Sequence, residues 1–410
     1  MSSAADGLPV ETDVLAPVER MRRALRGEKV DVLPAAPAYL SLFLADFERG
    51  YYIELYRRRM RGRSVYPIDH EEDTRLRAEA LFQSYGIFKV RPDWMEIHRG
   101  ASRAWAKRTE IVRLDDGTLC YRDRETGMQV PMEQVPIPTG DAVLAPPNAS
   151  QSDLWDISDQ LRGPEDVDAR LPIVPCEELL ARGDWDLPRL VVAEYGDRYF
   201  LSTVLDTPFS DAYDLLGFQG LMLIQHDNPQ LLHYLLERKL RQTMEVLAAW
   251  ARTGIHGVYV EEVFTGADVI SPRSYDEFVF TYNQPYFQHM RRLGLLSIHY
   301  VCGDVIPRLE RIAQLDVDAI AVEESKKSFR IELEEVIERV AGRAAVFGNI
   351  DAIRFGLHAT LEEMAAEVRR QAAIGARARG FVVSTGSPFP LDTNPRLIDT
   401  LTATAHTCRG

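Results

Sequence analysis

The segment from His299 to Cys302 holds the side chains of this chain that are best suited to bind a metal ion. An imidazole nitrogen and a cysteine thiolate are good ligands of Zn²⁺, and a carboxylate can complete a mixed site. Glu323 supplies such a carboxylate at the end of the next predicted strand. The pattern therefore predicts His299, Cys302 and Glu323 as metal ligands. The alternative is that Cys302 is a small buried apolar residue and His299 a hydrogen-bonded core histidine.

Other polar side chains follow further predicted strands. Glu261 and Glu262 end one strand and Asp206 ends another, and such carboxylates can serve as general acids, general bases or substrate contacts. We predict Glu262 and Asp206 as catalytic residues and Glu261, Asn349 and Ser387 as substrate-binding residues. Which glutamate faces the site stays open, since one of them could face the helical shell in a salt bridge. For Asp206 the alternative is a cap on the following turn.

The elements that must position these residues repeat as strand, helix, strand. Eight apolar segments read as strands, and most are followed by polar or small residues: 37–44, 87–90, 200–205, 257–263, 296–301, 319–322, 344–347 and 381–383. Parallel strands with helical crossovers that close after eight units predict an α/β fold, a (β/α)8 TIM barrel, spanning residues 1–410 as a single domain. In such a barrel the carboxyl ends of the strands meet at one face, so the polar strand-end residues should converge there.

Two additions to the barrel are predicted. The chain up to residue 63 reads as an N-terminal helical extension. Residues 100–140 show short alternating runs around the turn signals Asp116-Gly117 and Thr126-Gly127, which predicts a β-hairpin insertion. Whether this hairpin covers the site or makes a homodimer is left open. Residues 136–168 are rich in Pro, Ser and Asp and read as an exposed connection.

Composition limits the class of protein. The 410 residues carry 48 Lys plus Arg against 62 Asp plus Glu, a net charge of −14, which argues against broad binding to nucleic acid or an anionic membrane. Four cysteines are too few and too scattered for a disulfide framework. The N-terminus lacks the basic and apolar blocks of a secretory signal, and no apolar run is long enough to span a bilayer. A cytoplasmic protein with reduced thiols and a small-molecule substrate is expected.

Several stretches resemble the uroporphyrinogen decarboxylase superfamily: MRRALRGEKVDVLPAAP, TPFSDAYDLLG, GADVISPRSYDEFV, CGDVIPRLERIAQLDVDAIAVEES and VFGNIDA. The resemblance runs from about residue 18 to the C-terminus, and the hairpin insertion fits the methyltransferase-like branch, whose members work with corrinoid proteins. It implies a (β/α)8 barrel with its site at the strand ends. The arginines that grip carboxylates in true porphyrinogen decarboxylases are absent from PAAPAYLSLF, and STGSPFP stands where a histidine-containing loop is expected.

The resemblance also implies metal ligands. Methyltransferases of this kind hold Zn²⁺ with a His-x-Cys pair and a distant Cys, and IAVEES resembles the zinc-binding glutamate region of cobalamin-independent methionine synthase. Carried over, Cys302 and Glu323 would be ligands, with His299 the nearest histidine. This chain departs from the pattern twice. Its spacing is His-x-x-Cys, with Tyr300 at the position of the family histidine, and the distant Cys falls near Ser387.

Three functions follow from these observations. The first is methyl transfer between a small donor, a corrinoid on a separate protein and an acceptor thiol, with zinc as Lewis acid. The second is metal-independent decarboxylation of a small acid, with Asp206 or one glutamate of the 261–262 pair as proton donor. The third is a binding module that no longer turns over. Metal content, activity after chelation, and a ligand that raises the melting temperature without being consumed distinguish them.

Overall fold

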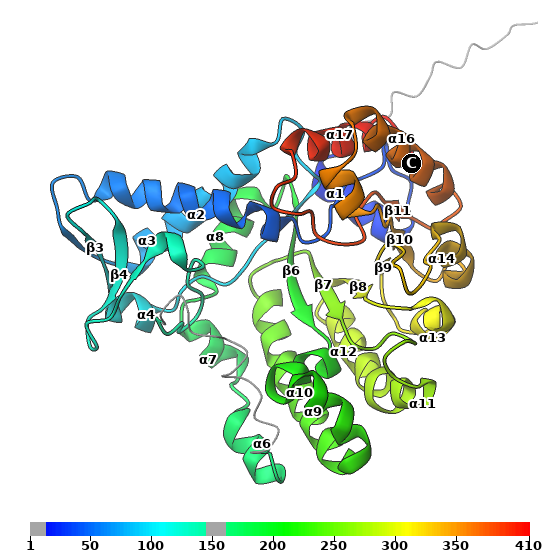
Figure 1. Cartoon of the computed structure of the whole chain (residues 1–410), viewed down its shortest axis with the longest axis horizontal. Helices are drawn as coiled ribbons and strands as arrows, with labels where there is room; N and C mark the ends of the chain where they lie inside the picture. Colours follow the sequence, from blue (N-terminus) through cyan, green and yellow to red (C-terminus); the bar gives the residue numbers. More distant parts are fainter. Residues whose placement is uncertain (1–13, 145–160) are drawn as a thin grey trace, which may run out of the picture.

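A curled sheet of seven parallel strands forms the centre of the protein (Figure 1). The computed structural model describes residues 14–144 and 161–410. The strands neighbour one another in the order β11-β10-β9-β8-β7-β6-β2, and every adjacent pair is parallel. Their bounds are β2 (Trp94–Glu96), β6 (Phe200–Asp206), β7 (Gly257–Glu262), β8 (Leu296–Val301), β9 (Ala319–Val322), β10 (Ala345–Phe347) and β11 (Phe381–Val382).

A short extended segment, residues 34–36, joins the two edge strands and completes the ring. The Ala36 amide donates to the Val383 carbonyl at 2.9 Å, and Ala35 forms a parallel bridge with Val383. On the other side, the Asp93 amide donates to the Ala35 carbonyl at 2.8 Å. The seven strands and this segment make eight parallel segments around the ring, which confirms the predicted barrel.

Helices surround the sheet (Figure 1). The helices that precede β6 in the chain are α1 (Pro17–Arg26), α2 (Leu40–Arg59), α3 (His70–Ser84), α4 (Arg103–Arg108), α6 (Pro164–Arg170), α7 (Cys176–Ala181) and α8 (Asp186–Tyr195). Of these, α2, α3 and α4 extend beside the part of the chain that projects from the sheet (Figure 1). After β6 come α9 (Pro208–Asp227), α10 (Pro229–Ala251), α11 (Pro272–Ser274), α12 (Thr281–Arg292), α13 (Leu309–Ile312), α14 (Leu333–Val340), α15 (Ala352–Leu357), α16 (Leu361–Gly375) and α17 (Pro395–Ala405). A π-helical stretch, Tyr275–Phe280, joins α11 to α12.

Two helices in the second half of the chain begin with side-chain caps. Ser271 caps α11 by accepting the Ser274 amide, with Pro272 at the first helical position. Thr360 and Glu363 form a reciprocal capping box at the start of α16.

Two of the eight predicted strands are wrong. Residues 37–44 turn into α2, and residues 87–90 follow a 3-10 turn, whereas the barrel uses residues 34–36 and β2 instead. The segment 34–36 and strand β2 each pair over only about three residues, which is too few to show an alternating pattern. The longer apolar runs next to them were therefore mistaken for strands.

Side chains alternate between two buried layers along each strand. On β7 and β8, Tyr259, Ile298 and Tyr300 point into the barrel, while Val258, Val260 and Val301 point toward the helices. The barrel interior is filled with aromatic rings. Tyr259 stacks on Tyr300 with centroids 5.3 Å apart, and Trp94 meets Tyr259 edge-on at 5.5 Å. The site must therefore lie above this plug, at the strand ends.

The insertion is a four-stranded antiparallel sheet, larger than the predicted hairpin. Strands β3 (Thr109–Arg113) and β4 (Leu119–Asp123) pair around the expected Asp116-Gly117 turn, and β5 (Gln129–Pro131) pairs with β4. On the other side, β1 (Val65–Pro67) pairs with β3, so residues outside 100–140 complete the sheet. Figure 1 shows this sheet beside α2 and α3, projecting from the barrel.

Within residues 14–144 and 161–410, no helix combines the length and apolar character needed to cross a bilayer. Part of the predicted exposed connection (residues 145–160) and the N-terminal residues 1–13 lie outside the described residues.

Candidate functional site

Strand register places Asp206 and Glu261 side by side at the barrel mouth. Asp206 on β6 is the register partner of Glu261 on β7, which in turn is the partner of Tyr300 on β8. Tyr300 points into the barrel, and parallel partners in one row share a face, so both carboxyl groups project on the inner side of the mouth. The predicted convergence of these two strand ends is present.

Because side chains alternate along a strand, the adjacent Glu261 and Glu262 point to opposite faces of β7. Glu261 is half-buried and inward, whereas Glu262 is completely buried and points into the helical layer. There the Glu262 carboxylate accepts hydrogen bonds from Thr265 Oγ1 at 2.8 Å, from His299 Nε2 at 3.0 Å and from Asn283 Nδ2. Glu262, which we predicted to be catalytic, therefore belongs to a buried polar network, and Glu261 is the glutamate that faces the site.

The predicted metal ligands do not meet. His299 and Cys302 are three residues apart, and residues separated by an odd number along a strand point to opposite faces. His299 is fully buried against Phe287 in the helical layer, while Cys302 packs at the edge of the interior cluster. Within the described parts of the chain, no three His, Cys, Asp or Glu side chains are placed to hold a metal ion. A set of His299, Cys302 and Glu323 thus does not fit a zinc site as folded.

Cys302 and Glu323 do lie on the same side of the mouth. Burial raises the pKa of the Cys302 thiol well above its usual value, and the charges of Glu323 and Glu261 raise it further. The Glu323 carboxylate accepts the Gly303 amide at 2.8 Å, and Lys326 Nζ lies 3.6 Å away. Lys326 lies closer still to Glu324, so one lysine serves both carboxylates, and burial holds the neighbouring Cys302 sulfur as a neutral thiol.

Two of the three predicted substrate contacts, Ser387 and Asn349, bond to the protein itself. Ser387 Oγ lies 2.8 Å from Glu324 Oε2 and 3.2 Å from Lys326 Nζ. The close approach of these loops requires Gly386, because a Cβ there would lie 2.3 Å from the Glu324 amide nitrogen. Asn349 Nδ2 donates to the Glu323 carbonyl at 3.1 Å. Both side chains hold the β9 loop in place.

Environment raises the pKa of the inward carboxyl groups. Burial raises the pKa of Asp206 to about 7, with the Glu261 charge as the next contribution. Burial also raises the pKa of Glu261, while the Tyr39 hydroxyl opposes that rise and the Glu323 charge adds to it. Two carboxyl groups so close together cannot both ionise easily, and Asp206 is the one whose pKa rises to about 7.

Glu96, at the end of β2, is a fully buried strand-end carboxylate that the sequence interpretation missed. Its carboxylate accepts the Ser41 amide at 3.0 Å and the Ser41 hydroxyl at the start of α2. Burial raises its pKa to about 7, although these hydrogen bonds oppose the rise. The sequence interpretation missed it because it placed the strand at residues 87–90, and β2 itself is too short to show a pattern.

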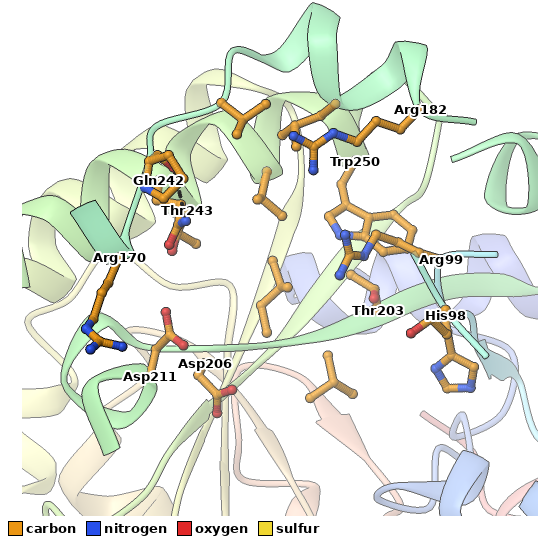
Figure 2. A pocket seen from close by; sticks show the side chains of 17 residues that line it. His98, Arg99, Arg170, Arg182, Thr203, Asp206, Asp211, Gln242, Thr243 and Trp250 are labelled. Atoms are coloured by element: carbon orange, nitrogen blue, oxygen red, sulfur yellow. Dashed lines mark hydrogen bonds between the residues drawn. The ribbon is translucent and has the colours of Figure 1, made fainter. Parts of the chain in front are cut away.

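A recess of about 650 Å³ opens beside the mouth, with Asp206 in its wall (Figure 2). Strand β6 contributes Thr203–Asp206, and α10 contributes Gln242, Thr243, Val246 and Trp250. The other wall consists of residues after β2 and around α6 and α7: His98, Arg99, Thr139, Arg170, Pro172, Val174, Leu179 and Arg182. A recess of this size takes a small molecule. The sequence interpretation named only Asp206 among these residues.

The fold and site define a class of protein: a (β/α)8-barrel enzyme whose titratable side chains gather at the carboxyl ends of the strands. A profile of the uroporphyrinogen decarboxylase (URO-D) family matches residues 157–408, more than half of the chain. The chain belongs to the uroporphyrinogen decarboxylase family, as its sequence resemblance indicated.

Individual relatives are distant. The uroporphyrinogen decarboxylase of Rhodococcus opacus (strain B4) is 26% identical over 186 residues, 45% of this chain and 50% of that protein. That of Psychromonas ingrahamii is 28% identical over 170 residues, 41% of this chain and 46% of the relative. The chain thus spans about half the length of the curated relatives it matches. A methyltransferase from Methanosarcina mazei shares the fold, with a TM-score of 0.63 at 16% identity, over 95% of this chain and 98% of the other.

Proposed function

We propose that this protein is a carboxy-lyase that removes CO₂ from a small organic acid, with Asp206 as the proton donor. The observation that carries the proposal is the Asp206 carboxyl group, which lies in the wall of the recess and whose pKa burial raises to about 7. An acid with that pKa is about half protonated at pH 7 and is well matched to donate a proton. The decarboxylase names of the curated relatives support the same chemistry.

The reaction balances with the groups present. The bond between the substrate carbon and its carboxylate breaks, CO₂ leaves, and the electron pair stays on that carbon. The substrate itself must delocalise this pair, for example through a conjugated ring or a β-carbonyl group. Asp206 then forms the new C–H bond with its proton and regains a proton from water. One proton is consumed per turnover, and no oxidant or reductant is required.

Glu261 has a positioning role in this scheme. Its carboxylate is the register neighbour of Asp206 and contributes to raising the Asp206 pKa. The negative charge of Glu261 also disfavours a second anion close to it, so a substrate carboxylate placed there is destabilised relative to CO₂.

The experiment measures CO₂ release from chelator-treated protein with uroporphyrinogen and a panel of monocyclic arene and β-oxo carboxylic acids. With the acid that reacts, Asp206→Asn should lower kcat by at least about 100-fold, since general acids contribute that much or more. Asp211→Asn is the matched control, because Asp211 lines the same recess but is paired with Lys239 at 3.1 Å. Full activity of Asp206→Asn, or complete loss of activity on chelation, would contradict the proposal.

Methyl transfer is the second candidate, favoured by the placement of Cys302 and Glu323 on one side of the mouth. It would require a corrinoid on a separate protein and, by analogy with the methyltransferase-like branch, zinc. Among the residues that the structure describes, the inward side chains do not supply a fitting ligand set, and His299 faces away. Near-stoichiometric zinc in protein purified without added metal, lost in Cys302→Ala, would move the assignment to this chemistry.

A further inference from the structure

The recess concentrates positive charge in a protein whose overall charge is strongly negative. The chain carries a net charge of −14, yet three arginines, Arg99, Arg170 and Arg182, line this one cavity. Of the two carboxylates in the same wall, Asp211 is paired with Lys239 at 3.1 Å. A concave site with low-dielectric walls focuses such a local field and selects ligands by charge.

Arg99 is anchored so that it presents part of its guanidinium to the cavity. On one side it pairs with the buried Asp184 at 3.2 Å, and it stacks over the Trp185 ring at 5.1 Å. Even so, 42% of the side chain stays exposed. A planar guanidinium fixed in this way loses little entropy when it binds a carboxylate, with which it can form two parallel hydrogen bonds.

Arg182 lies on the same side of the recess as Arg99, whereas Arg170 lies on the opposite side, toward Asp206 and Asp211 (Figure 2). The only ion-pair partner of Arg182 within the described residues is the exposed Glu178, at 3.5 Å. Such an exposed pair contributes little, so Arg182 can exchange it for an incoming anion at small cost.

Apolar side chains line the space between the two ends. Val174 and Leu179 come from the α6–α7 region, and Val246 and Trp250 from α10. The wall thus offers a cationic end and an apolar middle with an indole ring, and it runs along β6 to Asp206, whose carboxyl group points to the other side of the strand from Arg99 and Arg182 (Figure 2). A volume of about 650 Å³ accommodates a molecule of one or two rings.

We infer that this recess binds an organic acid with an apolar, ring-sized body, and that Arg99 and Arg182 hold its anionic group while its other end lies toward the end of β6 that bears Asp206. The inference rests on the proposed carboxy-lyase only for what happens at Asp206. Binding of the anion depends on the arginines alone. In the reaction, the acid group held by the arginines is a handle that is retained, and the carboxylate that leaves is a second one near Asp206.

Isothermal titration calorimetry tests this with 3-phenylpropanoate, its neutral amide 3-phenylpropanamide, and sulfate. We expect saturable binding of the acid, with the amide at least tenfold weaker and sulfate weaker than the acid. Arg99→Gln and Arg182→Gln should each weaken binding of the acid at least fivefold without changing that of the amide. Arg189→Gln is the matched control, because Arg189 is also 42% exposed and ion-paired but lies outside the recess.

The opposite results are equally clear. Equal binding of acid and amide, no saturable binding of the acid to the folded wild type, or unchanged binding in both recess variants would each overturn the inference. Thermal melts by circular dichroism confirm that the variants are folded. Asp206→Asn should keep the preference for the acid over the amide, so failure of the proposed reaction and failure of the anion site give different results.

Discussion

Asp206 and Glu261 are direct register partners on adjacent parallel strands, and both carboxyl groups face the barrel mouth above a plug of aromatic rings. The pairing forces two acids into one partly desolvated space, and the pKa of Asp206 rises to about 7 as a result. This pair gives the mouth an acid that keeps its proton in a substantial share of the molecules near neutral pH.

The first prediction concerns pH. Because Asp206 must be protonated to donate a proton, kcat/KM should fall about tenfold per pH unit above pH 7 and level off below it. A ¹³C NMR titration of labelled aspartate carboxyl groups, with Asp206→Asn to assign the signal, should show the same midpoint. A midpoint near 4 for this signal would remove the basis for Asp206 as an acid.

The same raised pKa predicts a stability effect of definite sign. Between the ordinary value of 3.8 and about 7, the unfolded chain loses the Asp206 proton while the folded protein keeps it, so rising pH lowers the free energy of unfolding. Asp206→Asn should therefore stabilise the protein at pH 8 by on the order of 2 kcal/mol, allowing for partial exposure, and raise Tm by about 2–4 °C. Below pH 4 the two proteins should melt together. Melting curves at both pH values check this, and a lower Tm for Asp206→Asn at pH 8 would contradict it.

His299 is predicted to act in stability. Its Nε2 contacts the fully buried Glu262 at 3.0 Å, so His299→Ala leaves a buried carboxylate short of one partner. We expect a loss of about 2–3 kcal/mol in urea unfolding. Cys302→Ala, at a partly exposed position, should cost less than about 1 kcal/mol. Metal content, measured by mass spectrometry, should be the same in both variants as in wild type. Loss of bound zinc in His299→Ala would show that the histidine turns toward the mouth in solution.

Position 300 allows a gain-of-function test of the alternation argument. Tyr300 lies on the same face as Cys302, two residues away, and its hydroxyl donates to the Gly386 carbonyl at 2.7 Å. Tyr300→His would place an imidazole next to Cys302 and Glu323, so the variant should bind zinc with three protein ligands. Tyr300→Phe loses the same hydrogen bond and is the control. Equal zinc content in the two variants, after exposure to zinc and desalting, would refute the prediction.

Barrel closure is predicted to depend on one buried ion pair. The fully buried Asp93 binds Arg20 Nη1 at 2.5 Å, the Ala35 amide at 2.8 Å and His406 Nε2 at 2.8 Å. It therefore ties α1, the closing segment and α17 together. Arg20→Ala should cost about 3–5 kcal/mol, because it leaves a buried charge uncompensated. Arg23→Ala, which breaks an exposed pair with Glu19, should cost less than about 1 kcal/mol, and denaturant midpoints compare the two.

Repetition along the chain was enough to predict the barrel. Six of the eight predicted strands coincide with β6–β11, because each is a mostly apolar run, and later helices begin with readable caps such as Ser271 and Thr360. The two N-terminal barrel segments, residues 34–36 and β2, were placed wrongly, because three residues carry too little pattern to identify a strand. Glu96, which ends β2, was missed for the same reason.

The recess shows a different limit. Arg99, Arg170 and Arg182 follow different elements and are separated by many residues, so no local spacing marks them as one group. Their meeting depends on how α6 and α7 pack against α10, which is a matter of side-chain fit between helices distant in the chain.

By itself the sequence determined the architecture, the family, and the acidic and thiol side chains available at the strand ends, because hydrophobic period and strand-end chemistry are local properties. Only the tertiary structure decided which of these side chains share a face. Glu261 and Glu262 are adjacent on one strand, so Glu262 points into the helical layer while Glu261 points to the mouth. His299 and Cys302 are three residues apart, and for the same reason they point to opposite faces. The physical reason is the two-residue period of a strand. The face to which each side chain points depends on where the strand begins and how it pairs with its neighbours, and closure of the barrel fixes both.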